Sequence, residues 1–516
     1  MNVTMVIGLV ILIGGGLLYG RFCDRVFEPD DRKTPAYTNK DGVDYVPMKR
    51  WKNSLVNLLN IAGTGPILGP IQGILFGPIA LITIPIGCVI GGAMHDYFCG
   101  MICTREGGIQ MPEMIKRHLP KSVSWFYTFF IMILLILCGT VFVYTPGDIA
   151  ATQLFGFGGT PGEASTWIIY GVIFVYYLIA TILPIDKIIG KIYPILGGIL
   201  ILSALGIFAM LFAGGYQLAE IFGDWTLGGF DFGAYFQSHH FIPSFFVTVA
   251  CGILSGFHST QTSLIARTME SERHGRMTFY NMMICEGFIA MIWTAGAMAV
   301  IGLGAKNSGI MMQLTETGWG YFESVDGALR QISPTSVVGV ICRNMLGDIG
   351  GMIAIIGVII LPITTGDTAL RSLRLVTAET FHIKQKNAVQ RILLAAPIFT
   401  ATLALLIWAK NDPNGFNVIW KYMGWANQTV SIFATSSIMI YMMHHGKTKY
   451  VWMPAIPLLF YSFVTTSYLL SAPEGFSLDI TLSYIISGVF TGFIFAAAIY
   501  RGSRKTFQIR ENSICL

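Results

Sequence analysis

Long apolar segments alternate with short polar connections along almost the whole chain. A helix that crosses the hydrocarbon core of a bilayer, about 30 Å thick, needs around 20 predominantly apolar residues. The runs are continuous, whereas strands of a membrane β-barrel alternate apolar and polar residues over about ten positions. The pattern therefore predicts an all-α polytopic membrane protein with about 13 transmembrane helices. The predicted spans are 3–20, 55–76, 79–103, 123–145, 166–184, 192–213, 241–264, 279–303, 351–370, 392–409, 416–443, 453–471 and 480–500.

Composition supports lipid as the solvent of this chain. The 516 residues are 53% hydrophobic and 12% charged, with a mean hydropathy of +0.63, whereas soluble domains carry about a quarter charged residues. Domains of ordinary size have too little interior to bury this apolar excess. These values exclude a soluble enzyme, a secreted disulfide scaffold and a disordered regulator. The net charge of +5 is small and dispersed, so no nucleic-acid partner is expected.

The placement of positive residues predicts the orientation in the membrane. If residue 1 lies outside, the inner connections hold 28 of the 33 Lys and Arg residues, and the outer segments 146–165 and 214–240 hold none. Cytoplasmic loops carry such an excess, so we expect an outer N-terminus and a cytoplasmic C-terminus. Segment 3–20 lacks a positive n-region and a small-residue cleavage site, and it is predicted to remain as a helix.

Two of the predicted spans contain glycine and proline clusters. Such clusters free backbone groups, which are tolerated at membrane depth only where they face protein or a watery cavity. The motif IAGTGPILGP occupies 61–70, and ACGILSGFHSTQ occupies 250–261. The two spans have opposite predicted orientations, which favours an inverted repeat of five plus five helices and a binding site at the bilayer midplane. The alternative is that the glycines only allow close helix packing.

The domain prediction follows from this repeat. The whole chain, 1–516, forms one integral membrane transporter domain. Its parts are an extra N-terminal helix (3–20), a cytoplasmic loop (21–54), repeat one (55–213, spans 2–6), repeat two (241–443, spans 7–11) and two extra helices (453–500). The sequence leaves open whether 325–347, within the hydrophilic segment 304–350, forms a re-entrant or a surface helix.

The broken helices predict the substrate site. Half-helix N-termini and exposed amides favour a carboxylate, and neither broken segment contains Arg or Lys. We therefore expect backbone amides and small polar side chains to orient a carboxylate-bearing substrate. The predicted substrate-binding residues are Gly63, Thr64, Gly65, Pro66, Gly69, Ser255, Gly256, His258, Ser259 and Gln261.

A third motif, LPITTGDTAL at 361–370, places two hydroxyls and a carboxylate beside a proline, which suits Na+ or a proton. The alternative is that Asp367 caps a helix break or pairs with Arg371 one turn away. Ionisable residues are rare in spans and usually functional. The predicted residues for ion or proton coupling are Ile61, Ala62, Thr364, Thr365, Asp367, His95, Asp96 and Glu286.

Simpler roles remain open for several of these groups. His258 is either a proton carrier or substrate donor, or a neutral packing residue. Glu286 lies close enough to the predicted inner interface to pair with Arg267 or Arg276. His95, Cys99 and Cys103 recur at helical spacing and offer soft metal ligands, but small buried residues are the favoured interpretation, and neither a metal nor another cofactor is predicted.

Other function classes are less well supported. No HExxH, GxSxG or Walker pattern is present, so a membrane enzyme is not expected. A channel would explain the glycine breaks but not their combination with ionisable groups. The nine cysteines include no pair placed for an extracellular disulfide. Trp425, Asn427 and Gln428 are predicted to form a gate or cavity wall, with an interfacial helix kink as the alternative.

A series of sequence blocks follows along the chain: DGVDYVP at 41–47, IAGTGPILGP at 61–70, HDY at 95–97, ACGILSGFHSTQTSLIART at 250–268 with GR at 275–276 and EG and IAMIW within 286–293, LPITTGDTALRSLR at 361–374 and FNVIWKYMGWANQT at 416–429. Together these blocks resemble the carbon starvation protein A family. The resemblance runs in order from about residue 37 to 455, and the chain is similar to a short member of that family.

The resemblance implies a prokaryotic inner-membrane transporter of the amino acid, polyamine and organocation superfamily, with a LeuT-type repeat. It implies uptake of peptides or pyruvate during carbon starvation, coupled to protons, with an amino acid or Na+-coupled symporter as the alternative. The partners are a small-molecule substrate and the lipid bilayer, and the oligomeric state is not predicted. One departure is that Val56-Asn57-Leu58 stands where longer members carry His-His-Phe, so a role of that histidine pair does not transfer.

Overall fold

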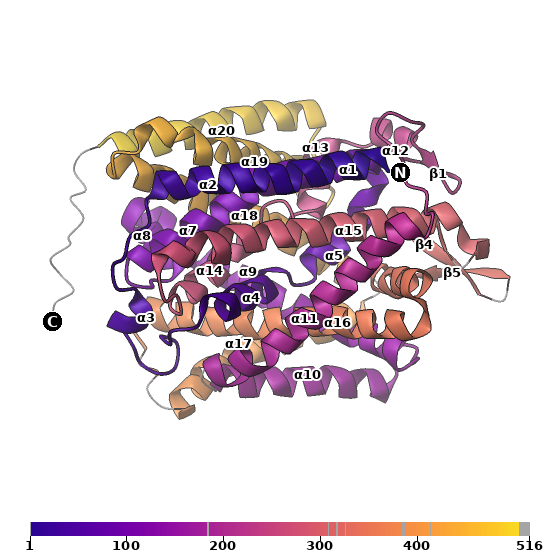
Figure 1. Ribbon diagram of the computed structural model, residues 1–516, viewed down its shortest axis with the longest axis horizontal. Helices are drawn as coiled ribbons and strands as arrows, with labels where there is room; N and C mark the ends of the chain where they lie inside the picture. The colour runs from indigo at the N-terminus through magenta and orange to yellow at the C-terminus, as the bar shows by residue number, and fades with distance from the viewer. Residues whose placement is uncertain are drawn as a thin grey trace.

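The computed structural model describes residues 2–182, 185–307, 309–315, 318–325, 327–383, 385, 388–412 and 414–504. Most of its helices run along one common direction (Figure 1). We call the end of the molecule that carries the strands the sheet end, and the opposite end, where α3 and α8 lie, the basic end. The predicted tail beyond residue 504 and residues 183 and 184 of the fifth predicted span lie outside the described residues.

The first half of the chain contains α1 (Val3–Val10), α2 (Gly16–Phe27), α3 (Pro35–Thr38), α4 (Arg50–Ile61), α5 (Gly65–Gly73), α6 (Ala80–Gly87), α7 (Ala93–Arg105), α8 (Met111–His118), α9 (Lys121–Ile149), α10 (Ala164–Ile182) and α11 (Ile185–Ala213). The second half contains α12 (Phe232–Ser238), α13 (Phe241–Thr248), α14 (Phe257–Ala266), α15 (Asn281–Leu303), α16 (Pro334–Thr380), α17 (Ala388–Asn411), α18 (Gly415–His444), α19 (Trp452–Ser471) and α20 (Ile480–Ser503). Short 3-10 or π-helical turns lie between or beside them: η1 (Ile11–Gly15), η2 (Ile74–Ile79), η3 (Cys88–Gly92), η4 (Ala150–Leu154), η5 (Glu272–His274), η6 (Arg276–Tyr280), η7 (Ala305–Asn307) and η8 (Thr448–Tyr450).

Helix interruptions occur at both predicted motifs. The first lies between the end of α4 and the start of α5, where Pro66 occupies the first turn of the new helix. Proline suits that position because its fixed φ is helical and the first amides have no intrahelical partner. The second lies between α13 and α14, where Gly252 adopts φ 88°. That left-handed conformation favours glycine, so sequence and backbone agree at this break.

The helices pack as two groups. In the first, which we call the bundle, α14 packs on α7, α15 packs on α5 and α6, and α4 packs on α14 and α15. In the second, which we call the scaffold, α16 packs along α9 and α11, and α17 packs on α9. Both breaks lie in the bundle. The two groups meet where α16 contacts α4 and α14.

Nine helices among the described residues are long and apolar enough to cross a membrane, so the chain is a multi-span membrane protein. The other four predicted spans have structural explanations. The second and seventh are interrupted by the breaks, and the fifth is present as the shorter apolar helix 164–180. The eleventh is α18, a continuous helix of 30 residues whose polar side chains reduce its hydropathy.

The chain is not wholly helical, which corrects the all-α prediction. Two short strands, β1 (Thr226–Leu227) and β2 (Phe230–Asp231), form a hairpin. Three more, β3 (Ile310–Thr315), β4 (Gly318–Val325) and β5 (Ala328–Ile332), form an antiparallel sheet in the hydrophilic segment 304–350. In the segment 325–347, considered for a re-entrant or surface helix, β5 is followed by the start of α16, which is helical from Pro334 until Gly347 breaks the helical backbone with φ 67°. The Tyr321 hydroxyl donates to the carbonyl O of Ile71 at 2.9 Å, which fastens the sheet to α5. Helix α16 then begins at Pro334, capped by Ser333.

We predict that Gly65→Leu destabilises the fold. A Cβ at Gly65 would lie 2.2 Å from Cβ and Sγ of Cys251, so a larger side chain must separate α5 from the second break. Overpacking of this kind costs about 1–3 kcal/mol. The matched control is Gly171→Leu on α10, because a Cβ there meets no heavy atom within 4 Å. Thermal unfolding in detergent should give a lower midpoint for the first variant, and equal midpoints for both would contradict this contact.

Candidate functional site

The two breaks touch each other inside the bundle. Gly65 lies against Cys251, and Gly69, one turn further along α5, lies against the carbonyl O of Thr248, which is 2.9 Å from the position of an added Cβ. Only residues without a side chain allow α5 to approach the second break so closely. The backbone groups released by both interruptions therefore converge on one buried place.

Unsatisfied polar atoms flank the first break, at Asn60 and Thr64, and another belongs to Gln261 of α14. Both polar atoms of the Asn60 amide, the Thr64 hydroxyl and Oε1 of Gln261 have no hydrogen-bond partner in the described part of the chain, and all three side chains are buried. Buried polar groups are normally paired, so such atoms indicate a ligand site or a structural reason for the exception. Thr64 and Gln261 were predicted from the sequence. Asn60 was not predicted from the sequence, although a single amide side chain within an apolar span indicates a functional residue.

The second break is capped by a residue from α18. Oδ1 of Asn427 accepts hydrogen bonds from the backbone N–H of Phe257 at 2.6 Å and from the hydroxyl of Ser255 at 3.0 Å. The N–H of Gly256 donates to the backbone carbonyl of Asn427 at 3.1 Å. Asn427 therefore occupies the N-terminus of α14, which the sequence predicted to bind the substrate carboxylate. Among the described residues, no side chain accepts a hydrogen bond from the first amides of α5.

Four ionisable side chains form a fully buried cluster inside the bundle. They are His95 and Asp96 of α7, His258 of α14 and Glu286 of α15. The Asp96 carboxylate lies 2.8 Å from Nδ1 of His95 and 3.0 Å from Nδ1 of His258. Nε2 of His258 lies 3.5 Å from Oε2 of Glu286. When both Nδ1–H groups donate to Asp96, one proton remains to be shared between His258 and Glu286, either as an ion pair or as a neutral pair.

The alternative pairing of Glu286 with Arg267 or Arg276 is wrong. Arg267 pairs with Glu379 at 2.7 Å, and Arg276 lies 3.8 Å from Asp24. Glu286 points into the bundle and is fully buried, whereas Arg276 is 40% exposed. Position along the span suggested an interfacial carboxylate, but the face of α15 on which Glu286 lies decides its partner.

The possible metal ligands His95, Cys99 and Cys103 are not grouped in the described residues. The Sγ atom of Cys103 instead lies 3.9 Å from the sulfur of Met111. A different trio is assembled, because ligand atoms of Cys251, His258 and Glu286 lie within 4.8 Å of one another. Sulfur, nitrogen and oxygen ligands of this type suit zinc. Since His258 and Glu286 already interact with each other, an acid–base role accounts for the same groups more simply.

The predicted ion-coupling residues divide between two places. Thr365 donates to the carbonyl O of Leu59 at 2.9 Å, and Thr364 donates to that of Leu361 at 2.7 Å. These contacts place α16 of the scaffold against the last turn of α4, which holds Ile61 and ends before Ala62. Asp367 is fully buried one half-turn further on. His95, Asp96 and Glu286 belong to the separate cluster in the bundle.

The remaining predicted residues make internal hydrogen bonds. The Ser259 hydroxyl donates to the carbonyl O of Gly256 at 2.6 Å. Nε1 of Trp425 donates to the carbonyl O of Thr465 at 3.0 Å, and Nε2 of Gln428 donates to that of Phe246 at 3.1 Å. Two of the three predicted gate residues therefore fasten α18 to α19 and to α13. Pro66 is buried at the start of α5.

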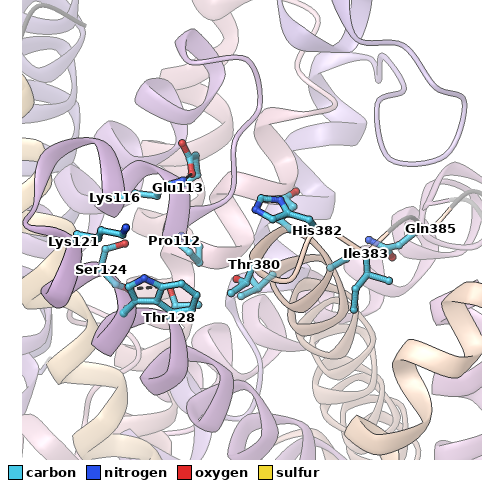
Figure 2. Close-up of a pocket in the computed structure, with 14 residues that line it drawn as sticks. Pro112, Glu113, Lys116, Lys121, Ser124, Thr128, Thr380, His382, Ile383 and Gln385 are labelled. Carbon is cyan, nitrogen blue, oxygen red and sulfur yellow. Dashed lines mark hydrogen bonds and ion pairs between the residues drawn. The ribbon is translucent and has the colours of Figure 1, made fainter. Parts of the chain in front are cut away.

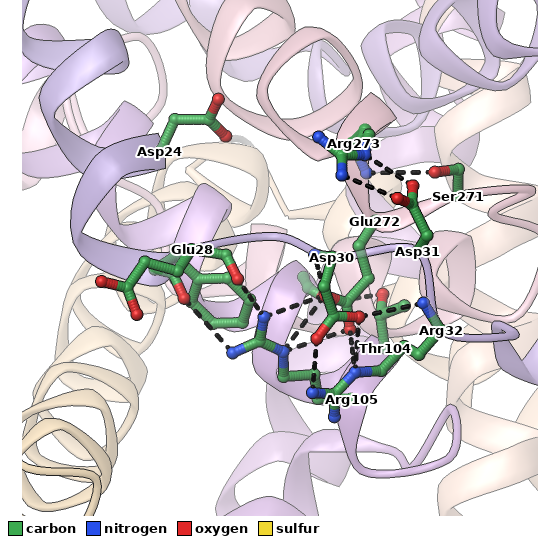
Figure 3. A network of polar contacts seen from close by, with 12 residues as sticks. Asp24, Glu28, Asp30, Asp31, Arg32, Thr104, Arg105, Ser271, Glu272 and Arg273 are labelled. Carbon is green, nitrogen blue, oxygen red and sulfur yellow. Dashed lines mark hydrogen bonds and ion pairs between the residues drawn. The ribbon is translucent and has the colours of Figure 1, made fainter.

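A network of ion pairs at the basic end holds the segment after α2 against the bundle (Figure 3). The buried carboxylate of Glu272 accepts from Nε and Nη2 of Arg105 at 3.1 and 3.0 Å, and from the backbone N–H of Asp30 at 3.3 Å. Arg105 also donates to the carbonyl O of Glu28 at 2.6 Å. This network joins the end of α7, the loop after α14 and the N-terminal helix.

A cavity of about 610 Å³ lies at the basic end, between α8, the first turns of α9 and the end of α16 (Figure 2). Lys116 and Lys121 lie on one side of it, and Thr380 and His382 lie on the other. The central breaks are buried and do not line this cavity.

Comparison with known proteins identifies a family. The family model described as carbon starvation protein CstA matches residues 2–154, 160–315 and 332–468. A Haemophilus influenzae protein described as an uncharacterized membrane protein is 39% identical over 330 residues, covering 56% of this chain and 89% of that protein. The peptide transporter CstA of Campylobacter jejuni is 23% identical over 562 aligned positions, covering 88% and 78%. The pyruvate/proton symporter BtsT of Escherichia coli is 24% identical over 559, covering 84% and 76%.

Two solved structures share the fold. A mutant of the Eremococcus coleocola manganese transporter has a TM-score of 0.55 at 10% identity, covering 89% of this chain and 97% of that protein. A Na+-coupled sialic acid symporter in a substrate-bound outward-open state has a TM-score of 0.51 at 12% identity, covering 96% and 97%. The TM-scores show a common arrangement of helices. At identities this low, the likeness carries no information about the substrate of this chain.

We predict that Asn427→Ala lowers stability by about 1–3 kcal/mol, because it leaves the buried Phe257 amide and the Ser255 hydroxyl without an acceptor. The control is Asn417→Ala, an exposed residue of the same helix, for which we expect a change within about 0.5 kcal/mol. Thermal unfolding of the purified variants in detergent measures both. Indistinguishable midpoints for the two variants would show that Asn427 does not cap α14.

Proposed function

The chain belongs to the carbon starvation protein CstA family, and from that premise we propose that it is a proton-coupled secondary transporter. It imports a small carboxylate-bearing nutrient, a peptide or pyruvate, across the inner membrane of a prokaryote during carbon starvation. The proposal is supported by one observation above all. Two helix breaks meet at a single buried place, with a cluster of ionisable side chains packed directly behind them.

The substrate site of this proposal lies at the N-terminus of α5. That end carries the partial positive charge of the helix dipole and has no side-chain cap, so it favours a carboxylate. The unsatisfied polar atoms of Asn60, Thr64 and Gln261 supply donors and acceptors for the rest of the substrate. The N-terminus of α14 is excluded from this role as long as Asn427 caps it.

Coupling to protons is assigned to His258 and Glu286. Neutral His258 beside protonated Glu286 holds one proton more than neutral His258 beside ionised Glu286. Asp96 orients the His258 ring through its contact with Nδ1. Both residues flank Cys251 of the second break. Loading or unloading the proton changes the charge beside the substrate site, which links the gradient to the substrate.

The transport cycle follows from the two packing groups. We assign the bundle and the scaffold to the moving and static parts of an alternating-access cycle. Thirteen spans, with spans 2–6 and 7–11 as inverted repeats, an outer N-terminus and a cytoplasmic C-terminus complete the assignment. The basic end is then cytoplasmic, in keeping with the 28 of 33 positive residues expected on that side.

Sodium coupling is the alternative, and one observation favours it. The hydroxyls of Thr364 and Thr365 lie beside the end of α4, close to the buried Asp367 carboxylate in the sequence of α16. Hydroxyl, carbonyl and carboxylate oxygens are the ligands that hard cations prefer. An amino acid substrate would fit the same α5 terminus. A channel or a membrane-embedded enzyme has weaker support.

Uptake into proteoliposomes tests the proposal. We expect labelled pyruvate, dialanine or alanine to accumulate against its gradient when the proton gradient is imposed alone. Accumulation driven by a sodium gradient alone, and abolished by Asp367→Asn, would favour the sodium alternative. Equilibration without accumulation under either gradient would indicate a channel and contradict both forms of coupling.

We predict that Glu286→Gln abolishes proton-driven accumulation but retains exchange of substrate between the two sides. Glutamine keeps the shape of the side chain and removes the site at which the shared proton is exchanged. Glu28→Gln is the matched control, since that carboxylate is 71% exposed and far from the breaks in sequence. Transport assays measure net uptake and counterflow for each variant. Proton-driven accumulation by Glu286→Gln at the level of the control would remove Glu286 from the coupling mechanism.

A further inference from the structure

Arg374, near the basic end of α16, is a buried guanidinium without an anion. Its side chain is 1% exposed, and Nε and Nη2 have no hydrogen-bond partner in the described part of the chain. No carboxylate oxygen among the described residues lies within 4.0 Å of a nitrogen of Arg374. An uncompensated buried charge is strongly unfavourable, so a guanidinium in this position needs an anionic ligand in some state of the protein.

The neighbouring arginines do have anionic partners. Nη2 of Arg267 donates to Glu379 at 2.7 Å, and its Nε donates to the carbonyl O of Gly108 at 2.8 Å. Nη1 of Arg371, one turn before Arg374, lies 3.5 Å from Oδ1 of Asp44. These three arginines therefore face two carboxylates in the described residues. Arg374 carries the positive charge that this group leaves uncompensated.

The two ion pairs join the bundle to the scaffold. Arg267 follows α14 of the bundle, and Asp44 precedes α4 of the bundle. Their partners, Glu379 and Arg371, both belong to α16 of the scaffold. Arg374 lies between these partners along α16. Arg374 therefore lies at the place where the two ion pairs hold the bundle and the scaffold together at the basic end.

Arg374 also lies between the breaks and the cavity. Thr365, which contacts the last turn of α4, precedes it by nine residues, or about 14 Å along a helix. Val376 and Glu379, two and five residues after it, line the cavity of about 610 Å³. Lys121 faces the same cavity and makes no ion pair in the described residues. Arg374 and Lys121 are thus positive groups on the basic-end side of the breaks. A carboxylate is the anion that the proposed substrate carries.

We propose that Arg374 forms a second carboxylate-binding subsite, on the cytoplasmic exit path between the broken helices and the basic-end cavity. This subsite rests on the proposed function for the identity of its ligand. Guanidinium binds a carboxylate with two parallel hydrogen bonds, and the free Nε and Nη2 atoms are one edge of that fork. A substrate carboxylate here competes with Asp44 and Glu379 for the arginines that join bundle and scaffold. Its arrival weakens those two ion pairs and favours opening toward the cytoplasm.

The test uses right-side-out and inverted membrane vesicles, which expose the outer and the cytoplasmic face separately. With labelled pyruvate, Arg374→Gln should raise the KM measured in inverted vesicles by about tenfold or more, because a charge-assisted hydrogen bond is lost. The KM in right-side-out vesicles should change by less than about twofold. Arg374→Lys should give an intermediate inner KM, because it retains the charge without the planar fork. Arg50→Gln, an exposed arginine at the same end, is the control and should leave both values unchanged.

Folding provides the second measurement. Arg374→Gln removes an unpaired buried charge, so its thermal midpoint in detergent without substrate should equal or exceed that of the wild type. A clearly lower midpoint would show that Arg374 is a structural ion-pair residue and would overturn the subsite. An unchanged inner KM in a well-folded Arg374→Gln would overturn it as well, while leaving the transporter proposal intact.

Direct binding separates this inference from the proposed function. If the wild type transports none of the tested substrates, thermal shifts with pyruvate, acetate and inorganic phosphate still report on Arg374. Stabilisation of the wild type by pyruvate and acetate that is lost in Arg374→Gln would support the subsite although the proposed function had failed. Stabilisation by phosphate alone would overturn the assignment to carboxylates.

Discussion

The contact between the two helix breaks governs the architecture of this protein. Lipid offers no hydrogen bonds, so backbone groups released within a span must be satisfied by protein or by a ligand. The chain meets this condition by placing one break against the other, Gly65 against Cys251, and by bringing Asn427 from a third helix to the start of α14. The other terminus, that of α5, has no side-chain cap from the part of the chain that the structure describes. The asymmetry between the two termini is the physical basis for locating the substrate at only one of them.

The ionisable residues are distributed according to the two packing groups. Asp96, His258 and Glu286 come from three helices of the bundle, so their hydrogen bonds stay within one unit. The pairs between Arg267 and Glu379 and between Asp44 and Arg371 span the two units. Charges of the first kind suit storage of a proton during a movement, whereas those of the second kind are broken and remade by it. This division gives the two sets of charges different tasks in the proposed cycle.

Glycine and proline clusters were sufficient to predict both breaks, because each break is a local property of the backbone, and the ordered sequence blocks were sufficient to predict the family. The partners of side chains were not predictable in the same way. Asp96 and His258 are 162 positions apart, and only the packing of α7 on α14 shows that they lie within hydrogen-bond distance of each other. The sequence placed Arg374 among the positive residues of the cytoplasmic connections, and its burial could not be predicted from the sequence. The β3–β5 sheet was missed because its short strands lie in a polar connection between spans.

The N-terminal helix is firmly joined to the bundle, and this has a mechanical consequence. Arg105 and Glu272 hold the chain just after α2, while α1 packs on α6 and α15. Only 33% of the most apolar window of α1 and α2 is buried within the protein, so most of this helix borders acyl chains. In the proposed cycle, movement of the bundle carries that helix through the lipid. The thickness of the bilayer then acts on the conformational step, so that the turnover of the proposed transporter depends on the surrounding bilayer as well as on its own side chains.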